Sequence, residues 1–152
     1  MSKPFSLQPL LNLAEHQSEA AARKLGLLNK RQQGVQQNLD TLQEYRKDYQ
    51  MRLQDSAKNG INPADLRNFQ VFINKLDEAI RQQLNLVEQS KAYTLAGRNE
   101  YNSSQRKLKS FDMLQQRHIE EQKKIAEKAD QKALDEHTSR ASAFKMSNIE
   151  NQ

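Results

Sequence analysis

The chain contains no cysteine and no tryptophan, and only 4 glycines and 3 prolines among its 152 residues. Without cysteine there can be no disulfide bond, thiolate metal site or cysteine nucleophile. So little glycine and proline argues against flexible linkers and turn-rich β folds. No apolar run approaches the ~18 residues of a membrane span. The N-terminal sixteen residues also lack the continuous apolar region of a signal peptide.

Apolar side chains are scarce as well. Hydrophobic residues make up 36% of the chain and aromatic residues 6%, and the mean hydropathy is -1.00. A typical soluble domain has roughly 45–50% apolar residues, glycine included. The 24 basic and 19 acidic residues nearly balance, so the chain does not fit the disordered class, which combines low hydrophobicity with high net charge. The composition indicates long helices, because a narrow line of helix–helix contact needs few apolar residues.

A single interruption divides the chain, at residues 58–65. Gly60 suits the left-handed position just past a helix end. Asn62 is a good N-cap, Pro63 fits the first helical position, and the carboxylate of Asp65 lies favourably in the first turn. The sequence therefore predicts one helix that ends here, a short turn, and a second helix.

A seven-residue repeat runs on both sides of this turn. A strict seven-residue period of apolar residues is typical of a left-handed coiled coil. The repeat is expected to form the line of contact between the helices, the seam. The first helix carries two registers, of which the second is interrupted by polar residues: Leu7, Ala14, Ala21, Leu28, Val35, Leu42, Tyr49; and Leu11, Ser18, Leu25, Gln32, Leu39, Arg46, Leu53. In the second helix the pattern fades at Ser90, Thr94, Gly97 and Ser104, which predicts a weakly packed middle with a shift of register.

A short connection makes the two helices antiparallel neighbours. The fold class is all-α, an antiparallel coiled-coil hairpin whose second helix is longer. Folding about the turn pairs residues whose numbers sum to about 121, which brings Tyr49 to Phe72 and Leu7 to Leu114. The expected organisation is a first helix over residues 1–58, a turn over 59–62, a second helix over 63–141 that overhangs past about residue 118, and a frayed tail over 142–152.

No arrangement of residues indicates catalysis. The four glycines are scattered, so there is no phosphate-binding loop. His16, His118 and His137 are too far apart on a hairpin to share a metal or acid–base site. A two-helix seam also offers no concave pocket that excludes water. We therefore expect no enzymatic activity, no metal and no cofactor.

Basic residues cluster at 23–24, 30–31 and 106–109. A solvated helix face is the favoured interpretation. A collar for an acidic partner or for nucleic acid is the alternative, although acidic residues interleave almost everywhere, which is unusual for a nucleic-acid-binding surface.

Aromatic residues gather near the turn. Tyr49 and Phe69 fall in the seam, whereas Tyr45, Phe72 and Ala79 fall just beside it. With Leu42 and Leu76 they can form an apolar flank. Packing is favoured over partner binding on the pattern alone, because aromatic residues beside a seam often widen a core.

Several segments resemble the flagellar type III export protein FliJ family, and together they cover nearly the whole chain. The resemblance lies in their joint order and spacing around the turn. These segments are Leu13-Ala14-Glu15 with Ala21-Ala22-Arg23-Lys24-Leu25-Gly26, the turn Asn59-Gly60-Ile61, Phe72-Ile73 with Leu76 and Ala79-Ile80, and Asp130-Gln131-Lys132-Ala133-Leu134-Asp135-Glu136 with Arg140.

The resemblance implies a cytoplasmic coiled coil, similar to the stalk of a rotary ATPase, at the inner membrane below the flagellum and not inserted in it. It implies three partners: the export ATPase hexamer, the cytoplasmic domain of the export gate and export chaperones, with no nucleic acid. The residues implied to contact the gate are Leu42, Tyr45, Tyr49, Phe72, Leu76 and Ala79. Those implied to enter the ATPase ring are Leu7, Leu10, Leu11, Phe111 and Leu114. At Asn38 and Gln83 the sequence departs from the family, so neither is included.

Ile125 and Ala129 are added to the ring-binding set because they form an apolar stripe on the overhang with no partner within the chain. Two alternatives stay open: an injectisome stalk protein of the same shape, and a general coiled-coil scaffold or nucleic-acid-associated protein.

Overall fold

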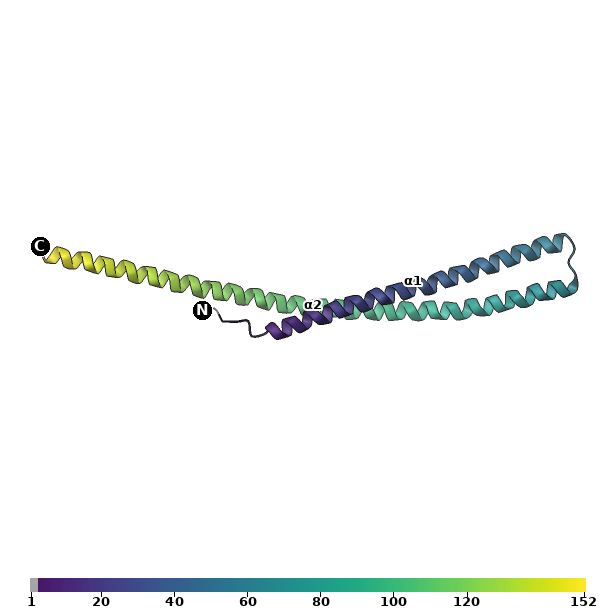
Figure 1. Ribbon diagram of the computed structural model, residues 1–152, viewed down its shortest axis with the longest axis horizontal. Helices are drawn as coiled ribbons and strands as arrows, with labels where there is room; N and C mark the ends of the chain where they lie inside the picture. The colour runs from purple at the N-terminus through teal and green to yellow at the C-terminus, as the bar shows by residue number, and fades with distance from the viewer. Residues whose placement is uncertain (1–2) are drawn as a thin grey trace. The chain divides into compact units, whose positions relative to one another are not determined.

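The computed structural model describes residues 3–152, and over that range it consists of two helices joined by a short turn (Figure 1). Helix α1 spans Gln8–Lys58 and helix α2 spans Pro63–Glu150. The described residues form no strand. The predicted all-α hairpin with a longer second helix is confirmed. The helices contribute to two compact units, residues 17–104 and residues 3–16 with 105–152, which we describe in turn.

The turn between the helices has the geometry that its sequence predicts. Gly60 adopts a φ of 84°, a backbone conformation that residues with a Cβ rarely take. The Asn62 side chain caps α2, because its Oδ1 accepts a hydrogen bond of 2.8 Å from the Ala64 amide. Pro63 is the first residue of α2, where its missing N–H costs nothing. The chain therefore reverses direction at the predicted position.

Within residues 17–104 the less exposed residues of both helices recur at alternating spacings of three and four. In α2 this spacing continues without interruption from Leu66 to Ser104. In α1 it runs from Ser18 to Ser56. Unbroken alternation of this kind is the mark of a heptad seam, so there is no shift of register in the middle of this unit.

The middle of the seam is tightly packed, so the expectation of a weak middle was wrong. Val87, Ser90, Thr94 and Gly97 are all buried. The Ser90 hydroxyl donates a hydrogen bond of 2.8 Å to the Val87 carbonyl, and the Thr94 hydroxyl donates one of 2.9 Å to the Ser90 carbonyl. Each hydroxyl thus has an acceptor in its own helix, and the Thr94 hydroxyl also lies 3.3 Å from the Leu28 carbonyl on α1. Small side chains let the two backbones approach, which buries the seam without large apolar residues.

In the second unit α1 begins at Gln8 rather than at the start of the chain. Pro4 disfavours helical geometry at the residue before it, and residues 3 and 4 are not helical. Pro9 is tolerated because it lies in the first turn of α1, where the amide has no helical partner. Leu11 and Ala14 are then buried, and they form the core of this unit.

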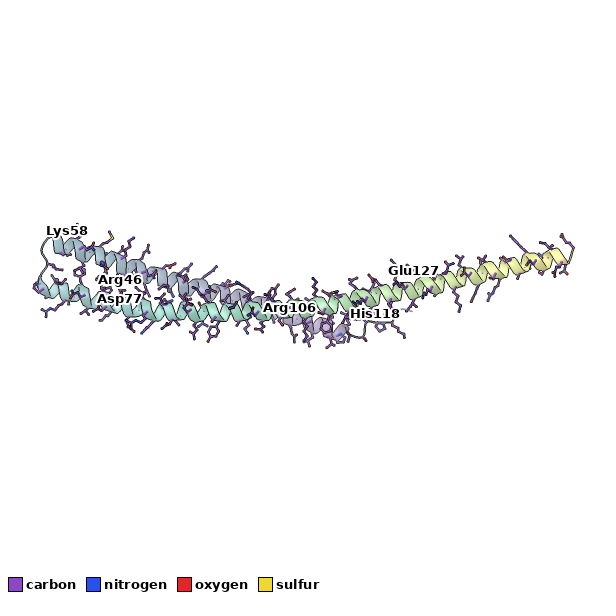
Figure 2. The ribbon with its side chains drawn as sticks, turned by 180° about the vertical axis from the view of Figure 1, so that it is seen from behind. Arg46, Lys58, Asp77, Arg106, His118 and Glu127 are labelled. Atoms are coloured by element: carbon purple, nitrogen blue, oxygen red, sulfur yellow. The ribbon has the colours of Figure 1, made fainter. Side chains whose placement is uncertain are left out.

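The segment of α2 after Gln122 is exposed along its whole length. Figure 2 shows Glu127 on a stretch of α2 that has no second helix beside it. The helix continues to Glu150, past the expected end at residue 141. Residues 123–150 contain neither glycine nor proline, so nothing in the sequence breaks the helix. We call residues 123–152 the overhang. Among the described residues no helix is apolar enough over a sufficient length to cross a membrane.

Candidate functional site

Three aromatic rings meet across the two helices close to the turn. The ring of Tyr49 on α1 stacks on that of Phe72 on α2, with centroids 4.1 Å apart and an interplanar angle of 26°. It also makes an edge contact with Phe69, at 5.8 Å and 63°. The predicted pairing of Tyr49 with Phe72 is confirmed. These contacts anchor the helices near the turn and fix the position of the aromatic surface above them.

The six residues implied to contact the gate lie in this part of residues 17–104, and we call them the tip patch: Leu42, Tyr45, Tyr49, Phe72, Leu76 and Ala79. Tyr45 is 57% exposed and Phe72 is 39% exposed. Leu42, Tyr49 and Ala79 are half-buried, whereas Leu76 is buried in the seam. The tip patch therefore offers Tyr45 and Phe72 to solvent, and Leu76 supports them from the core.

Two hollows adjoin the tip patch. One of about 300 Å³ is lined by Tyr45, Asp48, Tyr49, Arg52 and Phe72. The Arg52 guanidinium lies 5.8 Å from the centre of the Tyr49 ring, within the range of a cation–π contact. A larger hollow of about 660 Å³ lies at the turn, where its lining is mostly polar. The lining residues are Tyr49, Ser56, Asn59, Gly60, Ile61, Asn62, Asp65, Asn68, Phe69 and Phe72.

An ion pair crosses the seam beside the tip patch. Arg46 on α1 donates from Nε to the Asp77 carboxylate on α2, and Figure 2 labels the two residues on the neighbouring helices. Arg46 also donates to Gln50 Oε1 over 2.9 Å. The hydrogen bond to Asp77, and then its negative charge, raise the pKa of Arg46 above its ordinary value. The repeat alone marked Arg46 as an interruption. The signal that reveals its role is Asp77 near the opposite position.

The residues implied to enter the ATPase ring lie in the second unit and divide into three groups. Leu11 is buried, and Leu7 and Phe111 are half-buried. Leu10 and Leu114 are exposed on the paired part of the unit. Ile125 and Ala129 lie on the overhang and are exposed. The structure therefore does not gather all of them into one surface.

The expected pairing of Leu7 with Leu114 is not the seam contact that forms. The less exposed position is the next residue, Gln115. Its Nε2 donates a hydrogen bond of 3.0 Å to Gln8 Oε1. A polar pair thus closes this part of the seam and leaves Leu114 exposed on its flank.

His118 holds the N-terminal segment against α2, a role that the sequence did not reveal. Its ring lies 5.5 Å from the ring of Phe5, and its Nε2 donates a hydrogen bond of 2.8 Å to the Lys3 carbonyl. The Lys3 amide donates to Gln122 Oε1 over 3.1 Å. Pairing thus reaches Gln122, and the overhang begins slightly later than expected. Among the described residues no group of three or more potential metal ligands occurs.

These observations define the class of protein: a two-helix antiparallel coiled coil with an exposed aromatic patch close to its turn. A family model described as "Flagellar FliJ protein" matches residues 2–147. The chain therefore belongs to the flagellar FliJ family, as its motifs indicated.

Two curated relatives agree with this assignment. The "Flagellar FliJ protein" of Escherichia coli (strain K12) is 32% identical over 148 residues, which cover 95% of this chain and 99% of the relative. That of Salmonella typhi is 30% identical over 146 residues, with coverage of 95% and 99%. No solved structure matches the chain.

Proposed function

We propose that this protein is a non-enzymatic component of the flagellar type III export apparatus. In this proposal it is a coiled-coil stalk that binds the export ATPase hexamer and the cytoplasmic domain of the export gate, and it also assists export chaperones. It acts in the cytoplasm, at the inner membrane below the flagellum. Membership of the flagellar FliJ family supports a place in the flagellar export apparatus. The exposed apolar residues of the hairpin support the proposed contacts with its partners.

The observation that carries the gate contact is the exposure of Tyr45 and Phe72 above a fixed aromatic stack. Tyr45 lies beside the seam and Phe72 stacks on Tyr49, yet both rings remain exposed to solvent beside each other. Large aromatic side chains in such a position are typical of the residues that dominate binding energy at interfaces. Because Phe72 is held against Tyr49, little side-chain freedom is lost when a partner covers it.

The contact with the ATPase ring is proposed for the second unit. The exposed side chains of Leu10 and Leu114 lie on its paired part, and those of Ile125 and Ala129 lie on the overhang. Apolar surface left in water is unfavourable by about 25 cal/mol per Å². A ring of ATPase subunits that surrounds the overhang would cover this apolar surface. In this proposal, that contact alters ATP hydrolysis by the subunits.

Binding of the purified cytoplasmic domain of the gate to the full chain tests the proposal. Calorimetry compares the intact chain with a variant that carries Tyr45→Ser, Phe72→Ser and Ala79→Gln. We expect affinity to fall by about two orders of magnitude, as for the loss of several hot-spot residues. The matched control is Met51→Gln with Val71→Ser, because these residues are exposed to a similar extent outside the tip patch.

Helix content, followed by far-UV dichroism, separates recognition from folding. The proposal requires the triple variant to lose binding with its helix content intact. If the triple variant binds as the intact chain does, the tip patch is not the gate contact. If binding and helix content fall together, the aromatic residues pack rather than bind, as the sequence pattern alone favoured.

A further inference from the structure

Two rows of residues lie outside the seam, on the side of residues 17–104 that carries the tip patch. Each row takes one residue in every seven, and residues seven apart share a face in helices that follow a heptad seam. The α1 row is Lys24, Arg31, Asn38, Tyr45 and Arg52. The α2 row is Phe72, Ala79, Leu86, Tyr93 and Glu100.

Contacts at both ends show that the two rows run side by side. Near the turn, Tyr45 and Phe72 line the same hollow. At the other end, Lys24 Nζ lies 3.0 Å from Glu100 Oε2. The rows therefore flank one continuous surface between these two contacts, and the tip patch is only its first part.

The α2 row stays apolar well beyond the tip patch. Leu86 is 44% exposed and Tyr93 is 52% exposed, although neither is needed for the seam. Leu27 on α1 is also exposed, and it lies three residues from Lys24 and four from Arg31, which places it beside the α1 row. We call the surface from Phe72 to Tyr93, bordered by Leu27, the strip. It extends about 30 Å at ~1.5 Å per residue.

The spacing along the strip fits a helix better than an extended peptide. The apolar residues of the α2 row repeat every seven residues, which corresponds to about 10.5 Å along the axis. A helix returns to the same side at this interval. In an extended chain, residues on one face recur every ~6.6 Å, which does not match the ~10.5 Å between neighbouring residues of the row.

A notch and a charge further define the occupant. At Gly34, in line with Leu27 along α1, a Cβ would meet no atom within 4 Å, so there is open space for a side chain from outside. The exposed Arg31 adjoins this notch. Glu100 is the one carboxylate on the two rows, and it is paired with Lys24. A partner helix that packs on the strip can therefore place a carboxylate against Arg31 without facing a like charge.

We propose that the partner bound at the tip patch contributes one amphipathic helix, which packs along the strip as a third helix. Its apolar residues have heptad spacing, one of them fills the notch at Gly34, and a carboxylate faces Arg31. The inference rests on the proposed function, since it takes this partner to be the cytoplasmic domain of the gate.

Variants at the far end of the strip test this inference separately from the tip patch. The variant Leu86→Gln with Tyr93→Gln removes apolar surface from the strip. The matched control, Leu84→Gln with Leu95→Gln, changes residues that are 43% and 57% exposed. Each lies two positions away and therefore faces another side of α2. We expect the strip variant to bind the purified gate domain at least about tenfold more weakly, and the control to bind like the intact chain.

Two more variants test the notch and the charge. Gly34→Gln fills the notch and favours the helix, because glycine is a poor helix former, so a loss of gate binding cannot come from unfolding. Arg31→Glu is expected to weaken binding most at low salt, where charges are least screened.

The outcomes distinguish the two proposals. If the strip variant and Gly34→Gln bind normally while the tip-patch variant does not, the third helix is refuted and the proposed gate contact stands. If the tip-patch variant also binds normally, both fail.

Discussion

A methyl group built on the α-carbon of Gly97 would lie 2.6 Å from Leu28 Cδ1, on the opposite helix. Real Cβ atoms do not approach so closely, so a side chain at this position must displace Leu28. Gly97 is thus a point of close approach between the helices of residues 17–104, where an added side chain requires the end of Leu28 to move. By contrast, a Cβ at Gly26 would meet no atom within 4 Å.

This contrast predicts opposite effects at two glycines of the same chain. Gly97→Val should lower stability by about 1–3 kcal/mol, because it overpacks the seam and forces Leu28 aside. Gly26→Ala should raise stability by about 1 kcal/mol, because alanine favours the helix and meets no neighbour. Thermal unfolding followed by far-UV dichroism measures both. Equal destabilisation at the two positions would contradict the close approach at Gly97.

The middle of the seam shows where sequence reasoning failed. The period of seven predicted the fold and the seam, because these depend on the positions of apolar residues. Gly60, Asn62 and Pro63 predicted the turn, and the pairing of the helices was counted from it. The same method treated Ser90, Thr94 and Gly97 as gaps. The hydroxyl groups of Ser90 and Thr94 find acceptors in their own helix, so both residues can be buried. The small size of all three residues lets the backbones come together. Hydropathy does not register this kind of packing.

The ion pair between Arg46 and Asp77 predicts a non-additive response to substitution. Arg46→Leu leaves the half-buried Asp77 carboxylate without its partner, and should lower the melting temperature by several degrees. Arg46→Leu together with Asp77→Leu places one apolar residue in the seam and another beside it, and should restore stability. A double variant that is less stable than either single variant would show that the pair is required for the fold.

The pH dependence of this pair follows from the raised pKa of Arg46. A cation whose pKa is raised on folding contributes stability that is fully present below its ordinary pKa and is lost only as the pH rises through the folded value. For an arginine that range lies well above about pH 10. The contribution of the pair to stability should therefore stay constant between neutral pH and pH 10. Over this range the difference in stability between the intact chain and the Arg46→Leu variant should not change.

The N-terminal segment should be released by a change at either ring that holds it. Phe5→Ala removes the contact with His118, and His118→Ala also removes the hydrogen bond to the Lys3 carbonyl. The first turn of α1 then loses its support, so the amides of Gln8 and Leu11 should exchange with deuterium several-fold faster. His137→Ala, on the exposed overhang, is the matched control. Unchanged exchange in both N-terminal variants would contradict the anchoring role of His118.

The candidate site was predictable to the extent that it depends on periodicity. The spacing of Tyr45, Tyr49 and Phe72 placed two rings beside the seam and one within it, and the structure agrees. Arg46 and His118 could not be found in the same way, because each acts through specific contacts across the hairpin. Such pairs become visible only when the register of the two helices is known to within one residue.

The overhang should be dispensable for the fold and required for the ATPase. Residues 123–152 are all exposed, so their deletion removes no packing from the rest of the chain. We expect the truncated protein to keep its melting temperature, to lose helical signal in proportion to the residues removed, and to bind the gate domain with unchanged affinity. Stimulation of the purified ATPase should fall severalfold, because Ile125 and Ala129 are lost.

A full-length variant separates the role of the apolar stripe from the length of the helix. Ile125→Gln with Ala129→Gln keeps the overhang helical, because glutamine is a good helix former, and it removes the stripe alone. If stimulation falls in this variant as it does after truncation, the stripe is the surface that the ring recognises. If both proteins stimulate the ATPase as fully as the intact chain, the overhang is not the coupling element, and the paired residues of the hairpin must act alone.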